Sequence, residues 1–106
     1  MIIIDIIYKS KKIEILCNSL KEAKKQLGDK TGKRLLQRNC ELKAFENLSK
    51  IPSSLPYKRE KLTNKNNVWS IRIDQEWRLI IKPTEPNDNL ALITSIIIME
   101  VSKHYE

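Results

Sequence analysis

The sequence is poor in several residues and patterns on which special classes of protein depend. Only two of its 106 residues are glycine, and it contains no low-complexity tract, which argues against a disordered chain. Its two cysteines lack metal-ligand spacing, and its single histidine, His104, lies far from both in the sequence. We therefore expect no zinc site and no cofactor, and we expect Cys17 and Cys40 to be buried, reduced thiols.

Long hydrophobic runs are missing as well. The opening MIIIDIIY is short, is interrupted by Asp5 and has no basic segment before it, so it lacks the pattern of a signal peptide. No other stretch approaches the length of a membrane-spanning helix. These absences predict a cytoplasmic protein that does not act on membranes.

What the sequence has in excess is positive charge. Lysine and arginine number 20 against 13 aspartates and glutamates, for a formal net charge of +7. A positive surface attracts polyanions or an acidic partner protein, although lysines spread as widely as these are also typical of an ordinary solvated surface. The length and the 41% hydrophobic content predict one compact domain over residues 1–106.

The hydrophobic pattern of the first half predicts one strand and then helices. Residues 1–8 are apolar on both faces, as in a strand that lies inside a sheet and is covered on both sides. Residues 9–18 fit a helix or a strand, and we favour a helix. The sequence SLKE at 19–22 is a capping box that opens a short helix ending at Gly28, and a longer helix follows from about residue 30 to residue 50.

After Pro56 the hydrophobic period changes to two. Four strands are predicted, in the segments YKREKLT, VWSIRID, WRLIIK and LALITSIIIMEV. An N-terminal strand, a two-helix hairpin and then an antiparallel meander make an α+β domain with its helices packed on one face of the sheet.

The two central strands can be paired by the parity of their apolar residues. If the apolar positions between 69 and 81 all face the helices, Ile73 lies opposite Trp77 and the turn spans residues 74–76. Arg72 then lies opposite Arg78. A two- or four-residue turn inside TNKNNV would continue this register by pairing Arg59 with Arg72. The face turned away from the helices would carry four cations, namely Arg59, Lys61, Arg72 and Arg78.

Such a cluster can be interpreted in two ways. Like charges opposite one another destabilise a sheet by about 0.2–1 kcal/mol per pair, and an anion bound to the face would resolve that conflict. Guanidinium groups suit phosphate oxygens, and a sheet holds them rigidly. Alternatively, the arginine stems lie across an exposed sheet and bind nothing. The predicted strand pairing is compatible with both interpretations.

The end of the chain adds acid–base groups to this pattern. His104 and Tyr105 directly follow the last predicted strand. Histidine is suited to proton transfer near neutral pH.

The order of elements, the segment LGDKTGKRLLQRNCELKAFENLSKIP, the pair WSIRIDQEWRLII and the ending MEVSKHY carry a family resemblance. Over nearly its whole length the chain resembles the RelE/ParE superfamily of bacterial toxins, and specifically the HigB-like plasmid maintenance killer proteins of type II toxin–antitoxin modules. The resemblance implies a RelE-like fold. It also implies a metal-independent, ribosome-dependent endoribonuclease, or mRNA interferase, that inhibits translation and is silenced by a cognate HigA-like antitoxin.

The resemblance also implies roles for particular residues. By position, Lys61, Arg72 and Arg78 match the basic residues that contact phosphate in the family. His104 and Tyr105 match its C-terminal proton-transfer pair. Arg59 is added to the RNA-binding set by the strand register alone.

Two departures from the family leave the proton-transfer roles open. Family members commonly end in Asp-Tyr-His, whereas this chain has Lys103, His104 and Tyr105. Many members also carry a histidine where this chain has Glu60, and the predicted register turns Glu60 toward the helices. The base and the acid that assist attack of a ribose 2′-oxygen on the adjacent phosphorus therefore come from Glu60, His104 and Tyr105, in an order that the sequence does not specify.

Two other functions are compatible with the same scaffold. A ParE-like toxin would bind DNA gyrase without cleaving RNA, and a decayed toxin would bind only its antitoxin or RNA. Fold alone excludes neither.

Overall fold

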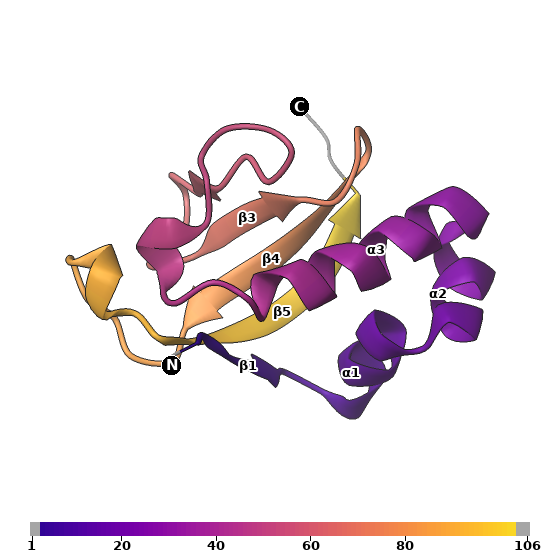
Figure 1. Cartoon of the computed structure of the whole chain (residues 1–106), viewed down its shortest axis with the longest axis horizontal. Coiled ribbons are helices and arrows are strands. Elements are labelled where there is room, and N and C mark those ends of the chain that lie inside the picture. The colour runs from indigo at the N-terminus through magenta and orange to yellow at the C-terminus, as the bar shows by residue number, and fades with distance from the viewer. Residues whose placement is uncertain (1–2, 104–106) are drawn as a thin grey trace.

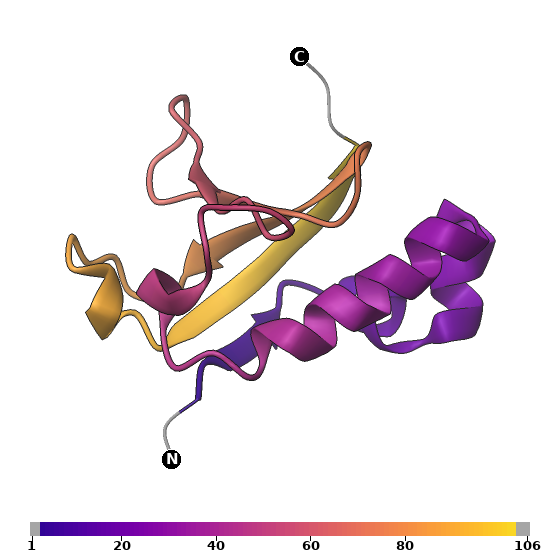
Figure 2. The same cartoon turned by 45° about the horizontal axis from the view of Figure 1, so that its top comes forward.

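The computed structural model describes residues 3–103 of the chain. Within these residues the chain forms a five-stranded mixed sheet and three α-helices, and the predicted α+β class is confirmed. Figures 1 and 2 show the helices on one side of the sheet. In chain order the elements are β1 (Asp5–Tyr8), α1 (Lys11–Asn18), α2 (Leu20–Leu27), α3 (Asp29–Leu42), β2 (Glu60–Lys61), β3 (Trp69–Arg72), β4 (Trp77–Pro83) and β5 (Ser95–Lys103).

The sheet has the strand order β1-β5-β4-β3-β2. β1 pairs in parallel with β5, and the remaining neighbours are antiparallel. The prediction of an N-terminal strand inside the sheet, covered on both faces, is therefore wrong. β1 lies at the edge, and its Ile7 is 44% exposed because the helices cover only one face.

Local hydrogen bonds explain where the first two helices begin. The Ser10 hydroxyl accepts from the backbone N–H of Ile13 at 3.2 Å, and the Ser19 hydroxyl accepts from that of Glu22 at 3.2 Å. Each serine satisfies a backbone donor that the first turn of a helix leaves unpaired. The helix favoured for residues 9–18 and the capped helix that follows it are both confirmed.

The third helix ends earlier than predicted. It stops at Leu42, and the chain continues as a loop and a short 3₁₀ helix, Leu48–Lys50. The backbone N–H groups of Ala44 and Phe45 still donate to the Glu41 and Leu42 carbonyls at the end of the helix, but the Phe45 carbonyl accepts from the backbone N–H of Ile4 at 2.7 Å and so turns the chain toward the strand region. Leu48 and Ile51 still pack in the core, which is why the apolar pattern looked helical beyond the true end.

The last predicted strand is also shorter at its start. Leu90–Leu92 form a 3₁₀ helix, with the Asn89 side chain accepting from the backbone N–H of Ala91 at 3.1 Å, and β5 begins only at Ser95. The first meander strand is reduced to the two residues of β2.

The core lies between the helices and the sheet. Its buried side chains come from the three helices and from the inward face of β3, β4 and β5, and they include Leu16, Ala23, Leu35, Leu42, Ile71, Leu79, Ile81, Ile96 and Ile98. Cys17 belongs to this core, and burial raises the pKa of its thiol to about 12 against a smaller lowering by the charge of Lys43. Cys40 is exposed, so the expectation that both cysteines are buried is wrong for Cys40.

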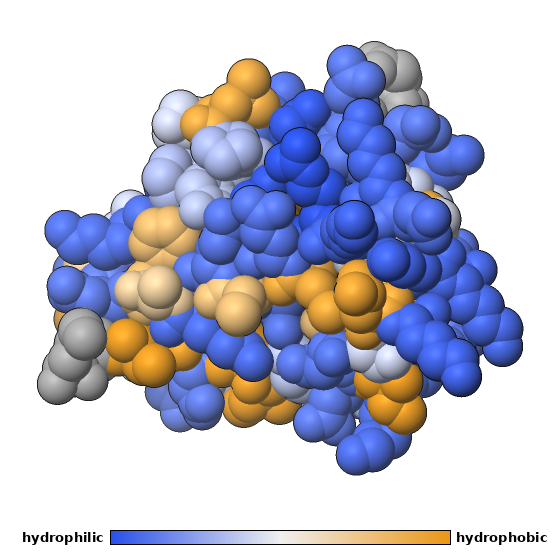
Figure 3. All heavy atoms as spheres, turned by 45° about the vertical axis from the view of Figure 1, so that its right-hand side comes forward, coloured by the Kyte–Doolittle hydropathy of each residue, from blue (hydrophilic) through white to orange (hydrophobic). Residues whose placement is uncertain are grey.

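The outer surface of the helical side is mostly hydrophilic, with apolar patches between the polar side chains (Figure 3). Exposed cations of α2 and α3, among them Lys25, Lys33 and Arg34, contribute to it. Among residues 3–103, none of the helices combines the length and the apolar character needed to cross a membrane.

A prediction about stability follows from the contact between α2 and α3. A Cβ atom on Gly32 would lie 2.7 Å from the backbone nitrogen of Lys24 and 2.9 Å from the carbonyl carbon of Ala23. Alanine gains about 1 kcal/mol over glycine in a helix, but overpacking costs about 1–3 kcal/mol or more when backbone has to move. We expect Gly32→Ala to lower the free energy of unfolding by roughly 1–2 kcal/mol in urea titrations.

The matched control for this prediction is Lys33→Ala, at the exposed neighbouring position of α3. Its unfolding free energy should stay within about 0.5 kcal/mol of the wild type. A Gly32→Ala protein as stable as the Lys33→Ala protein would show that the two helices are not in close backbone contact.

Candidate functional site

The pairing of β3 with β4 agrees with the predicted register. Arg72 lies opposite Arg78, and the backbone N–H of Ile73 donates to the Trp77 carbonyl at 2.9 Å. Hydrogen-bonded and non-hydrogen-bonded pairs alternate along antiparallel strands, and this bond makes Arg72 and Arg78 a non-hydrogen-bonded pair, the type in which side chains come closest. Because Ile71 and Leu79 are buried toward the helices, both arginines emerge on the opposite, open face of the sheet.

The pairing of β2 with β3 differs from the prediction by one residue. Glu60 lies opposite Ser70, and Lys61 lies opposite Trp69. The backbone N–H of Leu62 donates to the Val68 carbonyl at 2.8 Å, and Asn67 closes the loop in a left-handed conformation with φ of 55°. A slip of one residue turns every side chain of a strand to the other face. Glu60 is therefore on the open face, where the predicted register had placed cations.

The predicted face of four cations is accordingly wrong for two of its members. The Arg59 guanidinium lies 5.1 Å from the centre of the Trp69 ring, and its Nε donates to the Ile51 carbonyl at 2.8 Å. Burial lowers the pKa of Arg59. Lys61 is exposed opposite Trp69 and, like Arg59, does not line the hollow described below. Arg72 is on the open face beside Arg78 but does not line that hollow either. His104 and Tyr105 lie outside the described residues.

A β-bulge in β5 brings two further polar residues to the open face. Ile81 pairs with Ile98 and Ile80 pairs with Glu100, so Met99 is an extra residue on β5. Before the bulge, Ile96 and Ile98 face the helices, and after it Glu100 and Ser102 face the same side as Arg78. Neither residue was predicted to belong to the site. The available signal was the change in apolar spacing from Ile98 to Val101, which breaks the period of two.

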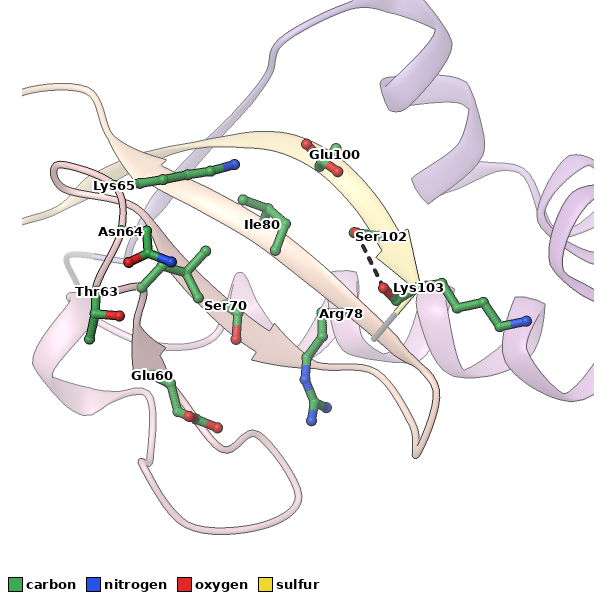
Figure 4. Close-up of a pocket in the computed structure, with 11 residues that line it drawn as sticks. Glu60, Thr63, Asn64, Lys65, Ser70, Arg78, Ile80, Glu100, Ser102 and Lys103 are labelled. Carbon is green, nitrogen blue, oxygen red and sulfur yellow. Dashed lines mark hydrogen bonds between the residues drawn. The ribbon is translucent and has the colours of Figure 1, made fainter. Parts of the chain in front are cut away.

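The open face contains a hollow of about 400 Å³. Its polar lining includes Glu60, Ser70, Arg78, Glu100 and Ser102, and the loop after β2 contributes Lys65. Figure 4 shows Glu60 and Arg78 on either side of Ser70, whereas the Lys103 side chain extends away from the hollow. The Lys103 Nζ instead lies 3.7 Å from Glu76 Oε2.

Arg78 is the most buried cation of the hollow. The residue is only 8% exposed. Burial and the neighbouring charge of Arg72 lower the pKa of Arg78, and the charges of Glu60 and Asp74 oppose them. Among residues 3–103, the Arg78 side chain makes one hydrogen bond, from Nη1 to the Asp74 carbonyl at 3.4 Å. Since a guanidinium has five N–H donors, most remain available to an anion in the hollow.

Asp74 fixes the turn that joins the two arginines. Its Oδ1 accepts from the backbone N–H groups of Glu76 and Trp77, both at 2.9 Å, and its Oδ2 accepts from the Thr31 hydroxyl of α3 at 2.6 Å. Burial by itself would raise the pKa of Asp74, but these hydrogen bonds and the charge of Arg72 outweigh it and lower the pKa. The carboxylate therefore stabilises the hairpin in its ionised form.

We expect this contribution to depend on pH. Because the pKa of Asp74 is lower in the folded chain than in the unfolded chain, its stabilisation is complete above the unfolded value of about 3.9 and is lost as the pH falls through the folded value. Asp74→Asn should cost about 1 kcal/mol of unfolding free energy at neutral pH. In urea titrations at decreasing pH, the gap from wild type should shrink.

The control for this measurement is Asp88→Asn, in an exposed loop. Its difference from the wild type should be small at every pH. A gap for Asp74→Asn that is constant with pH would mean that the Asp74 charge does not support the turn.

The described part of the chain, residues 3–103, contains no group of three or more His, Cys, Asp or Glu side chains arranged to hold a metal ion. Comparison of the chain with protein-family models, with curated proteins and with solved structures yields no match.

Proposed function

We propose that this chain is a HigB-like toxin of a type II toxin–antitoxin module, with a RelE-like fold, and that it cleaves mRNA on the ribosome. The observation that carries the proposal is that a largely buried guanidinium, that of Arg78, and the carboxylate of Glu60 line one hollow. Arg78 and Glu60 come from different strands and flank Ser70. A hollow of about 400 Å³ is in the size range of small-ligand sites, which is enough for one linkage of an RNA strand.

The reaction requires two proton transfers and stabilisation of charge. The ribose 2′-oxygen attacks the adjacent phosphorus, the bond from phosphorus to the 5′-oxygen breaks, and the products are a 2′,3′-cyclic phosphate and a 5′-hydroxyl. In our proposal Glu60 takes the proton of the 2′-hydroxyl. His104 or Tyr105, which follow Lys103 in the chain, gives a proton to the departing 5′-oxygen.

Arg78 and Arg72 stabilise the phosphorane that forms in between. Without an anion the two guanidinium groups repel each other, since they are directly opposite on neighbouring strands. A doubly charged phosphorane relieves that repulsion and accepts hydrogen bonds from both forks. The strands hold the arginines in place before the reaction, which is the arrangement that favours a transition state over a ground state.

The overall charge of the chain suits its proposed target. A net charge of +7 favours association with the polyanionic RNA of the ribosome. Lys65 extends from the loop after β2 along the rim of the hollow, next to Ile80 (Figure 4), and is available to a flanking phosphate. A cognate HigA-like antitoxin would silence the toxin by covering this site or by preventing its entry into the ribosome.

Primer extension on mRNA from cells that express the wild type or Arg78→Ala tests the proposal. We expect breaks inside translated codons, with 2′,3′-cyclic phosphate ends, in the wild type only. The Arg78→Ala sample controls for other nucleases in the cell. Growth arrest without such breaks, retained in Arg78→Ala, would contradict RNA cleavage and favour a toxin that binds DNA gyrase.

A further inference from the structure

Helix α3 contains an arginine that is buried as deeply as the leucines of the core. Arg38 is 1% exposed, and it lies between Leu35 and Leu42 on the face of α3 that meets the sheet. Burying a charge is costly unless it is paired and hydrogen-bonded. The partners of this side chain therefore indicate what it does.

The guanidinium of Arg38 bonds to the backbone at the end of β3. Its Nε donates to the Arg72 carbonyl at 2.7 Å, and its Nη2 donates to the Ile73 carbonyl at 3.3 Å. Its Nη1 forms an ion pair with Glu41, one turn further along α3. Its Cζ atom lies over the Tyr57 ring, 4.8 Å from the ring centre.

These contacts satisfy backbone groups at the end of β3 that have no neighbouring strand to pair with. β2 pairs only with Trp69 and Ser70, and the chain before it leaves the sheet at Lys58, whose φ is 45°. The edge of Arg72 that faces away from β4 therefore has no strand beside it. Its N–H donates to the Tyr57 carbonyl at 2.7 Å, and its carbonyl accepts from Arg38.

A second residue of α3 holds the other side of the same turn. Thr31 and Arg38 are seven residues apart, so they project from one face of the helix. Thr31 bonds to Asp74, and Arg38 bonds to Arg72 and Ile73. Helix α3 is therefore hydrogen-bonded to the β3–β4 hairpin at two points around the turn.

We infer that Arg38 is a positioning residue, which fixes the backbone of Arg72 and so aims the Arg72–Arg78 pair at a bound phosphate. The effect on RNA cleavage rests on the function proposed above, whereas the effect on phosphate binding does not. A planar fork is required, because a lysine at this position would offer a single ammonium to two carbonyls and an ion pair.

A role in folding alone makes a different prediction. Removing one partner of a buried ion pair is costly when the other charge stays buried, but the Glu41 side chain is 32% exposed, so water can solvate its carboxylate once Arg38 is replaced. Arg38→Met should therefore fold, and its functional defect should exceed its loss of stability. The matched control is Arg34→Met, one turn earlier on the exposed face of α3.

The test uses the full chain and inorganic phosphate as the probe. Side-chain Nε–H signals of Arg72 and Arg78 are followed by NMR during phosphate titration, and amide exchange is followed at Arg72. For Arg38→Met we expect phosphate affinity to fall about tenfold or more and exchange at Arg72 to accelerate, with partial recovery in Arg38→Lys. Arg34→Met should behave as the wild type.

Cleavage of mRNA on programmed ribosomes provides the second measurement. We expect kcat to fall about 10–100-fold in Arg38→Met with KM nearly unchanged, because the ribosome still binds but the guanidinium groups are misplaced. Wild-type protein that binds phosphate in an Arg38-dependent way but cuts no mRNA would contradict the proposed function and leave the positioning role intact.

Unchanged phosphate affinity and Arg72 exchange in a folded Arg38→Met protein would overturn the inference. If that variant does not fold, Glu41→Gln provides the test, since it releases one edge of the guanidinium and leaves both carbonyl bonds. The expected loss of phosphate affinity is then smaller, about two- to fivefold. No loss in Glu41→Gln would count against the inference.

Discussion

Replacing Arg78 with alanine is expected to slow the proposed cleavage of mRNA on the ribosome by about 10²–10³-fold, the usual effect of removing one donor that stabilises an oxyanion. The reason is the position of the side chain. Arg78 is 8% exposed, and its side chain is held in the middle of the sheet. In the alanine variant, water would not supply donors that are held in the same place. Single-turnover rates on ribosomes programmed with a defined mRNA would measure the effect.

We expect Arg78→Ala to lose activity while its unfolding free energy changes little. Removing Arg78 ends its repulsion with Arg72, which is worth about 0.2–1 kcal/mol, so we expect the unfolding free energy to stay close to the wild-type value. Arg78→Lys keeps the charge without the fork and should retain an intermediate rate.

Lys82→Ala provides the control for Arg78, because Lys82 is an exposed cation of the same strand. Its cleavage rate should stay within a few-fold of the wild type. Equal losses in the two variants would mean that net charge, and not the guanidinium in the hollow, governs the reaction.

Replacing Glu60, the proposed general base, with glutamine is expected to lower the rate of the proposed cleavage by about 10²–10⁴-fold, the range for loss of such a group. Glutamine keeps the size of the side chain but does not accept a proton. The ion pair between Glu60 and Lys58 is 3.7 Å long and about half exposed on both sides, so its loss has little effect on folding. The same single-turnover assay applies.

Glu100 is a matched carboxylate for this test. It lines the same hollow from β5. Glu100→Gln should stay within a few-fold of the wild type. A larger loss in Glu100→Gln than in Glu60→Gln would transfer the role of base to Glu100, and small losses in both would point to His104 and Tyr105.

The central hairpin of the site was predictable from its own residues. Six apolar side chains alternate through residues 69–81, and a slip of one residue would bury an arginine among tryptophans. The register that buries all six side chains has a lower free energy than any register that exposes some of them. The pairing of Arg72 with Arg78 could therefore be predicted before the fold was known. The helix start at Ser19 was predictable for a similar reason, since a cap depends on residues within one turn, whereas the pattern of residues 9–18 fitted a strand as well as a helix.

The register of β2 could not be predicted in the same way. Its residues around Glu60 are nearly all charged, so no apolar alternation favours one register over the other. The loop conformation decided it, with Asn67 in a left-handed conformation that shifts the pairing by one residue. That shift exchanged Glu60 for Arg59 and Lys61 on the open face.

The sequence by itself therefore determined the α+β class, the helix start at Ser19 and the Arg72–Arg78 pairing, because a local cap and apolar alternation each admit one low-energy arrangement. Only the tertiary structure decided that Glu60 faces the hollow, that the bulge at Met99 turns Glu100 and Ser102 toward it, and that Arg38 supports Arg72 from another element. Each of these depends on contacts between segments distant in the chain, and a single added residue in a loop or strand reverses which face a side chain occupies.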